Sequence, residues 1–170
     1  MDAVLATTKK KEPIPYQASL KQSKPGTADE HWGLHFHPQQ AGKGDLHVLH
    51  AVSDDKKNGV LQVEHLNKGT YNPPAGSTNH PIAQFPSQSK ALAAMRDVKN
   101  NVKLDQQFPH ENCVDFTCKA VKHMADNGHI PQANHDTFKQ HYDAQKDAVR
   151  ANTNTAGNRK KAGVPSTPSR

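Results

Sequence analysis

The sequence predicts an α+β domain in which a small antiparallel sheet packs against about three helices. Short segments of alternating apolar and polar residues occupy the first half of the chain. Apolar residues at helical spacing dominate from about residue 87 onward. The strand-like segments follow one another through short, turn-like connections, and this pattern is typical of antiparallel pairing.

Four segments are predicted as strands, and the clearest of them carries a cluster of histidines. In this segment Trp32, Leu34 and Phe36 alternate with histidines and a glycine, and Pro38 ends it. Turn-like residues 54–59 separate the last two strands. In chain order, the predicted strands are Tyr16–Leu20, His31–His37, Asp45–Ser53 and Val60–Leu66. A sheet of three or four strands follows.

Residues 69–86 are predicted to be a loop, because this segment holds four prolines and two glycines. The first helix is expected directly after it, with the Ser87 hydroxyl as its N-cap. The residues of this helix that are expected to face inward are Leu92, Met95, Val98 and Val102.

The second helix is expected to begin near Asn112 or Cys113 and to end at Asn127-Gly128, a common C-terminal stop. Pro131 separates it from the third helix, for which Asn134 is the expected N-cap. The residues at helical spacing in the third helix are Phe138, Tyr142, Gln145 and Val149.

Both ends of the chain are expected to be disordered. Hydrophobic residues make up 33% of the sequence, and residues 151–170 are rich in Asn, Thr, Gly, Pro and Ser without an aromatic residue. Such a segment buries too little apolar surface to offset the entropy of ordering it. We therefore expect a flexible segment over residues 1–12, one domain over residues 13–150, and a disordered basic tail over residues 151–170.

The net charge of +6 does not indicate a specific nucleic-acid binder. Four of the six net positive charges come from residues 151–170, so the remaining chain is nearly balanced. Aromatic residues, on which nucleic-acid bases would stack, are only 5% of the chain. The expected partner is instead a protein, a peptide or a small acyl or amide substrate.

The sequence predicts a cytoplasmic protein with reduced cysteines. It shows neither the apolar stretch of a secretory signal nor an apolar run of the roughly 20 residues that a membrane helix needs. Cys113 and Cys118 are five residues apart on a predicted helix, so they point in different directions and do not favour an intrahelical disulfide.

Cys113 is the candidate nucleophile. It stands where the second helix begins, and the partial positive charge of a helix N-terminus lowers the pKa of a thiol. An imidazole beside the sulfur would complete an activated nucleophile. Cys113 shares its direction with Thr117 and Ala120, so it is expected to point toward protein. Cys118 lies deeper in the helix and is interpreted as an ordinary core cysteine.

The segments His31-Trp32-Gly33-Leu34 and Asn112-Cys113-Val114-Asp115-Phe116 resemble the circularly permuted papain-like superfamily. That superfamily includes lecithin retinol acyltransferase-like, PPPDE-type and permuted NlpC-type proteins. The chain looks closest to small fungal proteins with His-Trp-Ala-like and Asn-Cys-Gln-Asp-Trp-like motifs. The resemblance covers residues 16–130 and implies a permuted papain-like fold, with the histidine before the cysteine in sequence.

The resemblance also implies catalytic roles. It makes Cys113 the nucleophile and His31 its general base, with a third polar residue on the next strand to orient the imidazole. His50 is preferred for that third role, and His47 stays open as the alternative. Gly33 replaces the usual alanine, and two further residues of the second motif differ from the fungal group, which puts substrate preference in doubt.

The implied activity is that of a cysteine-dependent hydrolase or acyl transferase that acts on an amide, isopeptide or ester without a cofactor. The backbone N–H of Cys113 is the generic oxyanion donor. Two other interpretations remain open. His31, His35 and His37 share one face of a strand and could hold a zinc ion. Alternatively, the domain is a non-catalytic interaction or effector module.

Overall fold

A computed structural model describes residues 11–27, 30–54, 60–77, 79–104 and 112–161 of the chain. Five antiparallel strands form one sheet in the order β4-β3-β2-β1-β5. The strands are β1 Tyr16–Ser23, β2 His31–Pro38, β3 Asp45–Asp54, β4 Val60–Thr70 and β5 His80–Phe85. The helices are α1 Gln88–Asn101, α2 Cys113–Asp126 and α3 Gln132–Lys161. The prediction of an α+β domain with an antiparallel sheet and three helices is confirmed.

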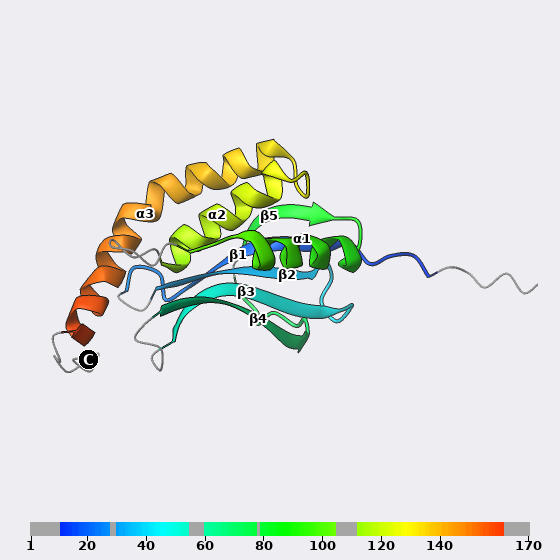
Figure 1. Ribbon diagram of the computed structural model, residues 1–170. Coiled ribbons are helices and arrows are strands. Elements are labelled where there is room, and N and C mark those ends of the chain that lie inside the picture. Colours follow the sequence, from blue (N-terminus) through cyan, green and yellow to red (C-terminus); the bar gives the residue numbers. More distant parts are fainter. Residues whose placement is uncertain (1–10, 28–29, 55–59, 78, 105–111, 162–170) are drawn as a thin grey trace, which may run out of the picture.

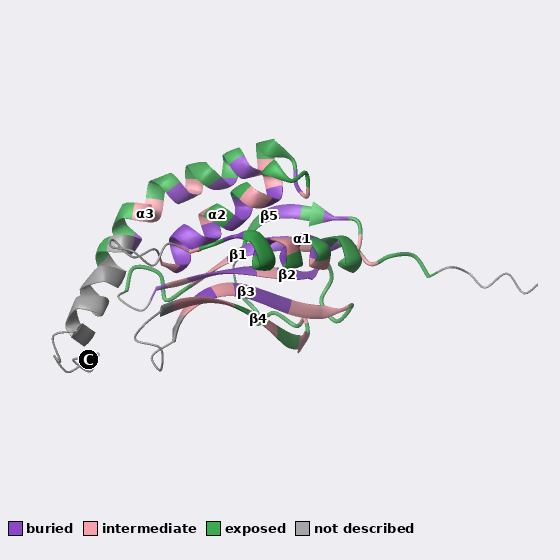
Figure 2. Ribbon diagram, in the orientation of Figure 1, coloured by how far each residue is buried: buried purple, intermediate pink, exposed green. Residues whose placement is uncertain are grey.

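The hydrophobic core lies between the sheet and the helices that cover one of its faces (Figure 1). The alternation predicted for β2 is present, because Trp32, Leu34 and Phe36 are fully buried against that helical layer. Buried residues line the facing sides of the sheet and helices, whereas exposed residues line the outer sides of α1 and α3 (Figure 2). The opposite face of the sheet carries none of the three helices (Figure 1).

The fifth strand corrects the prediction of a loop over residues 69–86. Strand β5 lies at the edge of the sheet and pairs with β1, with a register shift between Ala18 and Ser19. The prolines that argued for a loop are tolerated there, since Pro81 lies on an edge strand, where a missing N–H costs little, beside that irregularity. The sheet therefore has five strands and not three or four.

The starts of α1 and α2 match their predicted caps. Ser87 accepts a hydrogen bond from the backbone N–H of Lys90, and Asn112 caps α2. The expected cap of α3 was wrong, because this helix begins two residues earlier, at Gln132. The Asn134 amide instead donates to the carbonyl of Ile82 at 2.7 Å and so ties α3 to β5.

Helix α3 also passes the boundary expected at residue 150 and continues to Lys161. Residues 151–161 contain no proline to end the helix, and the first one downstream is Pro165. The expected flexible residues 1–10, most of the turn at 54–59 and the tail residues 162–170 lie outside the described residues.

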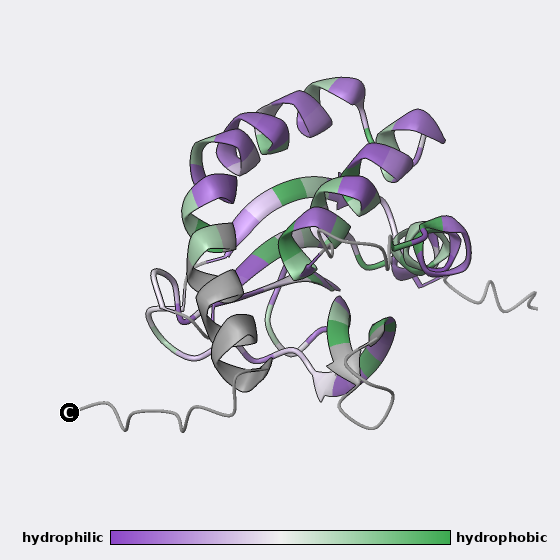
Figure 3. Ribbon diagram, turned by 60° about the vertical axis from the view of Figure 1, so that its left-hand side comes forward, coloured by the Kyte–Doolittle hydropathy of each residue, from purple (hydrophilic) through white to green (hydrophobic). Residues whose placement is uncertain are grey.

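The described part of α3 is largely hydrophilic, with a few apolar residues among the polar ones (Figure 3). Within the described ranges, none of the helices combines the length and the apolar character that crossing a membrane requires.

Candidate functional site

The site is built around the first residue of α2. The Asn112 side chain accepts hydrogen bonds from the backbone N–H groups of Val114 at 3.0 Å and Asp115 at 3.2 Å. The Asp115 carboxylate accepts in return from the backbone N–H of Asn112 at 3.2 Å, which completes a capping box. Asp115 also accepts from the hydroxyl of Tyr142 on α3 at 3.3 Å. These bonds hold Cys113 at the N-terminus of the helix.

Replacing Asn112 by alanine is expected to lower the free energy of unfolding by about 1–2 kcal/mol, because two backbone N–H groups lose their acceptor. Asn112→Ser keeps an acceptor at the N-cap and is expected to retain most of the stability. Urea unfolding of the two variants and the wild type measures the difference. An alanine variant as stable as the serine variant would refute a role for this cap.

The sulfur of Cys113 lies against the backbone of β2, next to His31. The backbone N–H of Trp32 donates to the sulfur at an N···Sγ distance of 3.4 Å, and the Cys113 side chain is almost fully buried. Strand β2 pairs with β3 only from Leu34 onward, whereas β3 stays paired with β4 as far as Asp54. The sulfur therefore binds β2 where this strand has separated from β3.

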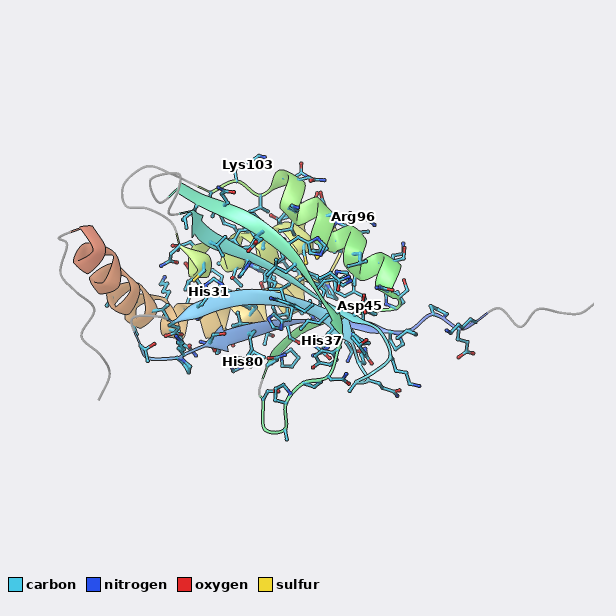
Figure 4. All side chains as sticks on the ribbon, turned by 90° about the horizontal axis from the view of Figure 1, so that it is seen from below. His31, His37, Asp45, His80, Arg96 and Lys103 are labelled. Atoms are coloured by element: carbon cyan, nitrogen blue, oxygen red, sulfur yellow. The ribbon has the colours of Figure 1, made fainter. Side chains whose placement is uncertain are left out.

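Three side chains from neighbouring strands form a hydrogen-bonded chain at the same end of the sheet. The Nε2 atom of His31 lies 2.8 Å from the Nδ1 atom of His50, and the two rings pack edge to face. The Nε2 atom of His50 lies 2.9 Å from the Oε2 atom of Glu64. Strands β2, β3 and β4 thus supply one residue each. His31 lies at one end of β2, and His37 lies near the other end (Figure 4).

The structure brings His31 and His50 together and places His47 elsewhere. His47 points to the helix-covered side of the sheet, as does its strand neighbour Leu49, and its Nδ1 atom lies 3.0 Å from the Nε2 atom of His65. The alternating geometry of β3 makes this separation unavoidable, since residues 47 and 50 are an odd number apart.

Sequence reasoning missed Glu64, although a signal for it was available. Strands β3 and β4 pair Asp54 with Val60, and the same antiparallel register places His50 opposite Glu64. Counting along the two strands from this pair therefore points to a carboxylate beside the preferred third residue.

No hydrogen bond joins the Cys113 sulfur directly to the His31 ring in the described part of the chain. Strand alternation turns the His31 side chain to the face opposite Trp32, while the sulfur approaches from the helical side. The sulfur nevertheless contacts the N–H that directly follows His31.

Burial decides the protonation of both groups. It raises the pKa of the Cys113 thiol, and the N–H groups of Trp32, Cys113 and Val114 offset this only in part. The expectation of a lowered pKa was wrong for the net effect, because desolvation outweighs the contribution of the backbone N–H groups. Burial, followed by the nearby His50, lowers the pKa of His31. The resting site therefore holds a neutral thiol and a neutral imidazole at pH 7.

The other residues considered from the sequence take separate positions. His37 contacts Ser19 at 3.0 Å and the carbonyl of Pro38 at 2.9 Å, away from His31. Within residues that the structure describes, no group of three or more His, Cys, Asp or Glu side chains is arranged to hold a metal ion. Cys113 and Cys118 are both free thiols, and Cys118 is half-buried and packs against the hydrophobic core.

Part of the cysteine-bearing motif, His110 and Glu111, lies outside the described residues, whereas Asn112 to Phe116 lie within them. The site therefore consists of a buried sulfur that accepts from the backbone N–H of Trp32, and a His-His-Glu chain on β2, β3 and β4. Comparison with protein-family models, curated proteins and solved structures finds no match, so the chemistry of this site follows from its geometry alone.

Proposed function

We propose that this protein is a cysteine-dependent hydrolase or acyl transferase that cleaves an amide, isopeptide or ester. In this proposal Cys113 is the nucleophile, His31 is the general base, and His50 orients the His31 ring. The observation that carries the proposal is the convergence at the start of β2. There the sulfur contacts the N–H of Trp32, and the preceding residue begins the chain of imidazoles.

The hydrogen-bonded chain selects the tautomer that a general base needs. The Glu64 carboxylate can only accept, so the bond at His50 Nε2 requires a proton on that nitrogen. With Nε2 as the donor, the Nδ1 atom of His50 is the acceptor for the N–H of His31 Nε2 in this proposal. The remaining ring nitrogen of His31, Nδ1, is left with a free lone pair. This is the nitrogen that would take the proton of the thiol.

The neutral pair implies general-base catalysis rather than a preformed thiolate–imidazolium pair. His31 Nδ1 removes the thiol proton as the sulfur attacks the substrate carbonyl, and an S–C bond forms. Collapse of the tetrahedral intermediate breaks the bond to the leaving amine or alcohol, which takes the proton from His31. Water or an acceptor amine then resolves the thioester. The backbone N–H of Cys113, at the helix start, is the candidate oxyanion donor.

The order of the elements supports the same proposal. A strand that carries the histidine precedes the helix that opens with the cysteine, and the candidate third residue lies on the next strand. This is the order implied by the resemblance to the circularly permuted papain-like superfamily, so we propose that fold for the chain.

Site-resolved alkylation tests the proposal. Full-length protein is treated with iodoacetamide at pH 7, and the labelling rates of Cys113 and Cys118 are followed by mass spectrometry. We expect His31→Ala to slow labelling of Cys113 by roughly 10- to 100-fold, because the base is lost. Labelling of Cys118, which is remote from the histidine chain, is expected to stay unchanged and serves as the internal control. Equal rates at Cys113 in both proteins would refute the assignment of His31.

A non-catalytic interaction module on the same fold is the second candidate. It is favoured by the burial of Cys113, whose side chain is only 7% exposed, and by the raised pKa of the thiol. Such a module predicts slow alkylation of Cys113 that does not depend on His31. The alkylation experiment therefore separates the two functions.

A further inference from the structure

Two neighbouring cavities lie on the helix-free face of the sheet. The first, of about 260 Å³, is lined by both histidines of the candidate site and by Gly33. The second, of about 330 Å³, extends to Tyr71 and the segment that follows it. Both are lined by Lys21, His35, Leu46 and Lys68. The two cavities therefore form one continuous feature, which we call the sheet groove.

The sheet groove is long enough for an extended peptide. It starts at His31 and reaches Tyr71, whose ring stacks on His37 with centroids 4.3 Å apart. The stretch of β2 from His31 to His37 measures roughly 20 Å, and an extended peptide of about six residues has the same length. A small acid would occupy only part of this groove.

Gly33 forms part of the floor of the sheet groove. A Cβ atom at this position would lie 3.6 Å from the Cβ of His50 and 3.8 Å from a methyl of Val48, which are ordinary contact distances. An alanine therefore fits at Gly33, whereas a larger side chain would project into the groove. This position offers a way to block the groove without touching a charged residue.

The lining of the sheet groove is cationic. Lys21 and Lys68 border both cavities, and no aspartate or glutamate is found among the described lining residues. In the described part of the chain, no ion pair engages either lysine. Between them lies the half-buried ring of His35, for which the described residues provide no hydrogen bond. Leu46 and Leu66 add an apolar surface.

We infer that the sheet groove binds an acidic peptide in an extended conformation. Its carboxylates lie against Lys21 and Lys68, its apolar side chains contact Leu46 and Leu66, and one carbonyl lies toward His31. This binding does not depend on the proposed function, because the Cys113 sulfur does not line the groove. The charge of the lining and the length of the groove favour this ligand over a neutral peptide or a small anion.

Fluorescence anisotropy with full-length Cys113→Ala protein tests the inference without turnover. The probe is a fluorescein-labelled hexapeptide, Ala-Glu-Val-Glu-Leu-Ala, and its neutral counterpart carries Gln in place of Glu. We expect the acidic probe to bind more tightly. The Lys21→Gln/Lys68→Gln double variant is expected to weaken it by roughly 5- to 20-fold. The matched control, Lys90→Gln/Lys99→Gln, removes two exposed charges from α1 and is expected to bind the probe normally.

Gly33→Leu is expected to abolish binding by filling the groove, while Gly33→Ala retains it. Equal affinity for the two peptides, or unchanged binding by the Lys21/Lys68 variant, would overturn the inference. So would binding of the wild type to phosphatidylserine vesicles without binding to the peptide. If the acidic probe binds but the alkylation of Cys113 is independent of His31, the groove stands and the catalytic proposal falls. If the alkylation of Cys113 depends on His31 but the acidic probe does not bind, only the inference about the groove is refuted.

Discussion

Replacing Cys113 by alanine is expected to abolish acyl transfer, with a loss of at least ~10³-fold in the rate of p-nitrophenyl acetate cleavage. The sulfur is the atom that forms the covalent bond, so no other group at the site can replace it. In the wild type we expect a burst of nitrophenolate of about one equivalent per chain when acylation outpaces deacylation. Mass spectrometry is expected to find the acetyl group on Cys113.

Cys118→Ala is the matched control for this prediction. It removes the second free thiol, which lies in the same helix but away from its N-terminus, and it is expected to leave the burst intact. His31→Gln is expected to slow acylation without changing the fold. An acetyl group found on Cys118, or a burst that survives in Cys113→Ala, would refute the assignment of the nucleophile.

The pH dependence of acylation tests whether His31 is the base. Burial and His50 lower the pKa of His31 below its ordinary value of 6.5, so the ring stays an unprotonated base as the solution becomes mildly acidic. We therefore expect the acylation rate to be maintained as the pH is lowered to 6.5 and to fall only at lower pH. His50→Ala removes one cause of the lowered pKa and is expected to move the fall to higher pH.

The parts of the site that could be predicted from the sequence are those that local chemistry determines. Asn112 and Asp115 form a cap within four residues, so the position of Cys113 at the helix start could be predicted from their spacing alone. Strand alternation likewise separates His50 from His47 and directs Trp32 into the core. Each of these predictions depends on the regular geometry of a helix or strand backbone.

The parts that could not be predicted depend on contacts between distant segments. Strand β5 exists because β1 offers it a free edge, and its own prolines argue against a strand. The pKa of the Cys113 thiol is raised because the sulfur is buried against β2, some 80 residues earlier in the chain. The helix start alone predicts the opposite shift. The burial of the Cys113 sulfur depends on the folded chain, so the sign of its pKa shift could not be predicted from the sequence alone.

Mild acid is expected to destabilise the fold, and His35 is expected to be the main reason. Its position between β1 and β3 lowers its pKa to about 4, chiefly through burial and then through His37, Lys21, His50 and His31. The ordinary pKa of 6.5 applies in the unfolded chain. Between these two values the unfolded state binds more protons than the native state, so the free energy of unfolding falls as pH falls. The loss from this ring amounts to about 2–3 kcal/mol between pH 6.5 and 4.

Urea unfolding of wild type and His35→Gln across this pH range measures the effect. The variant cannot bind the proton, so its stability is expected to depend less steeply on pH, by about 2–3 kcal/mol over the interval. Lys90→Gln removes an exposed charge that does not titrate in this range and is expected to keep the wild-type dependence. Binding of an acidic peptide in the sheet groove is expected to oppose this effect. A carboxylate beside His35 stabilises the protonated ring, so the peptide is expected to reduce the acid-induced loss of stability in the wild type but not in His35→Gln. Parallel pH curves for the wild type and His35→Gln would show that this ring does not govern the acid stability of the fold.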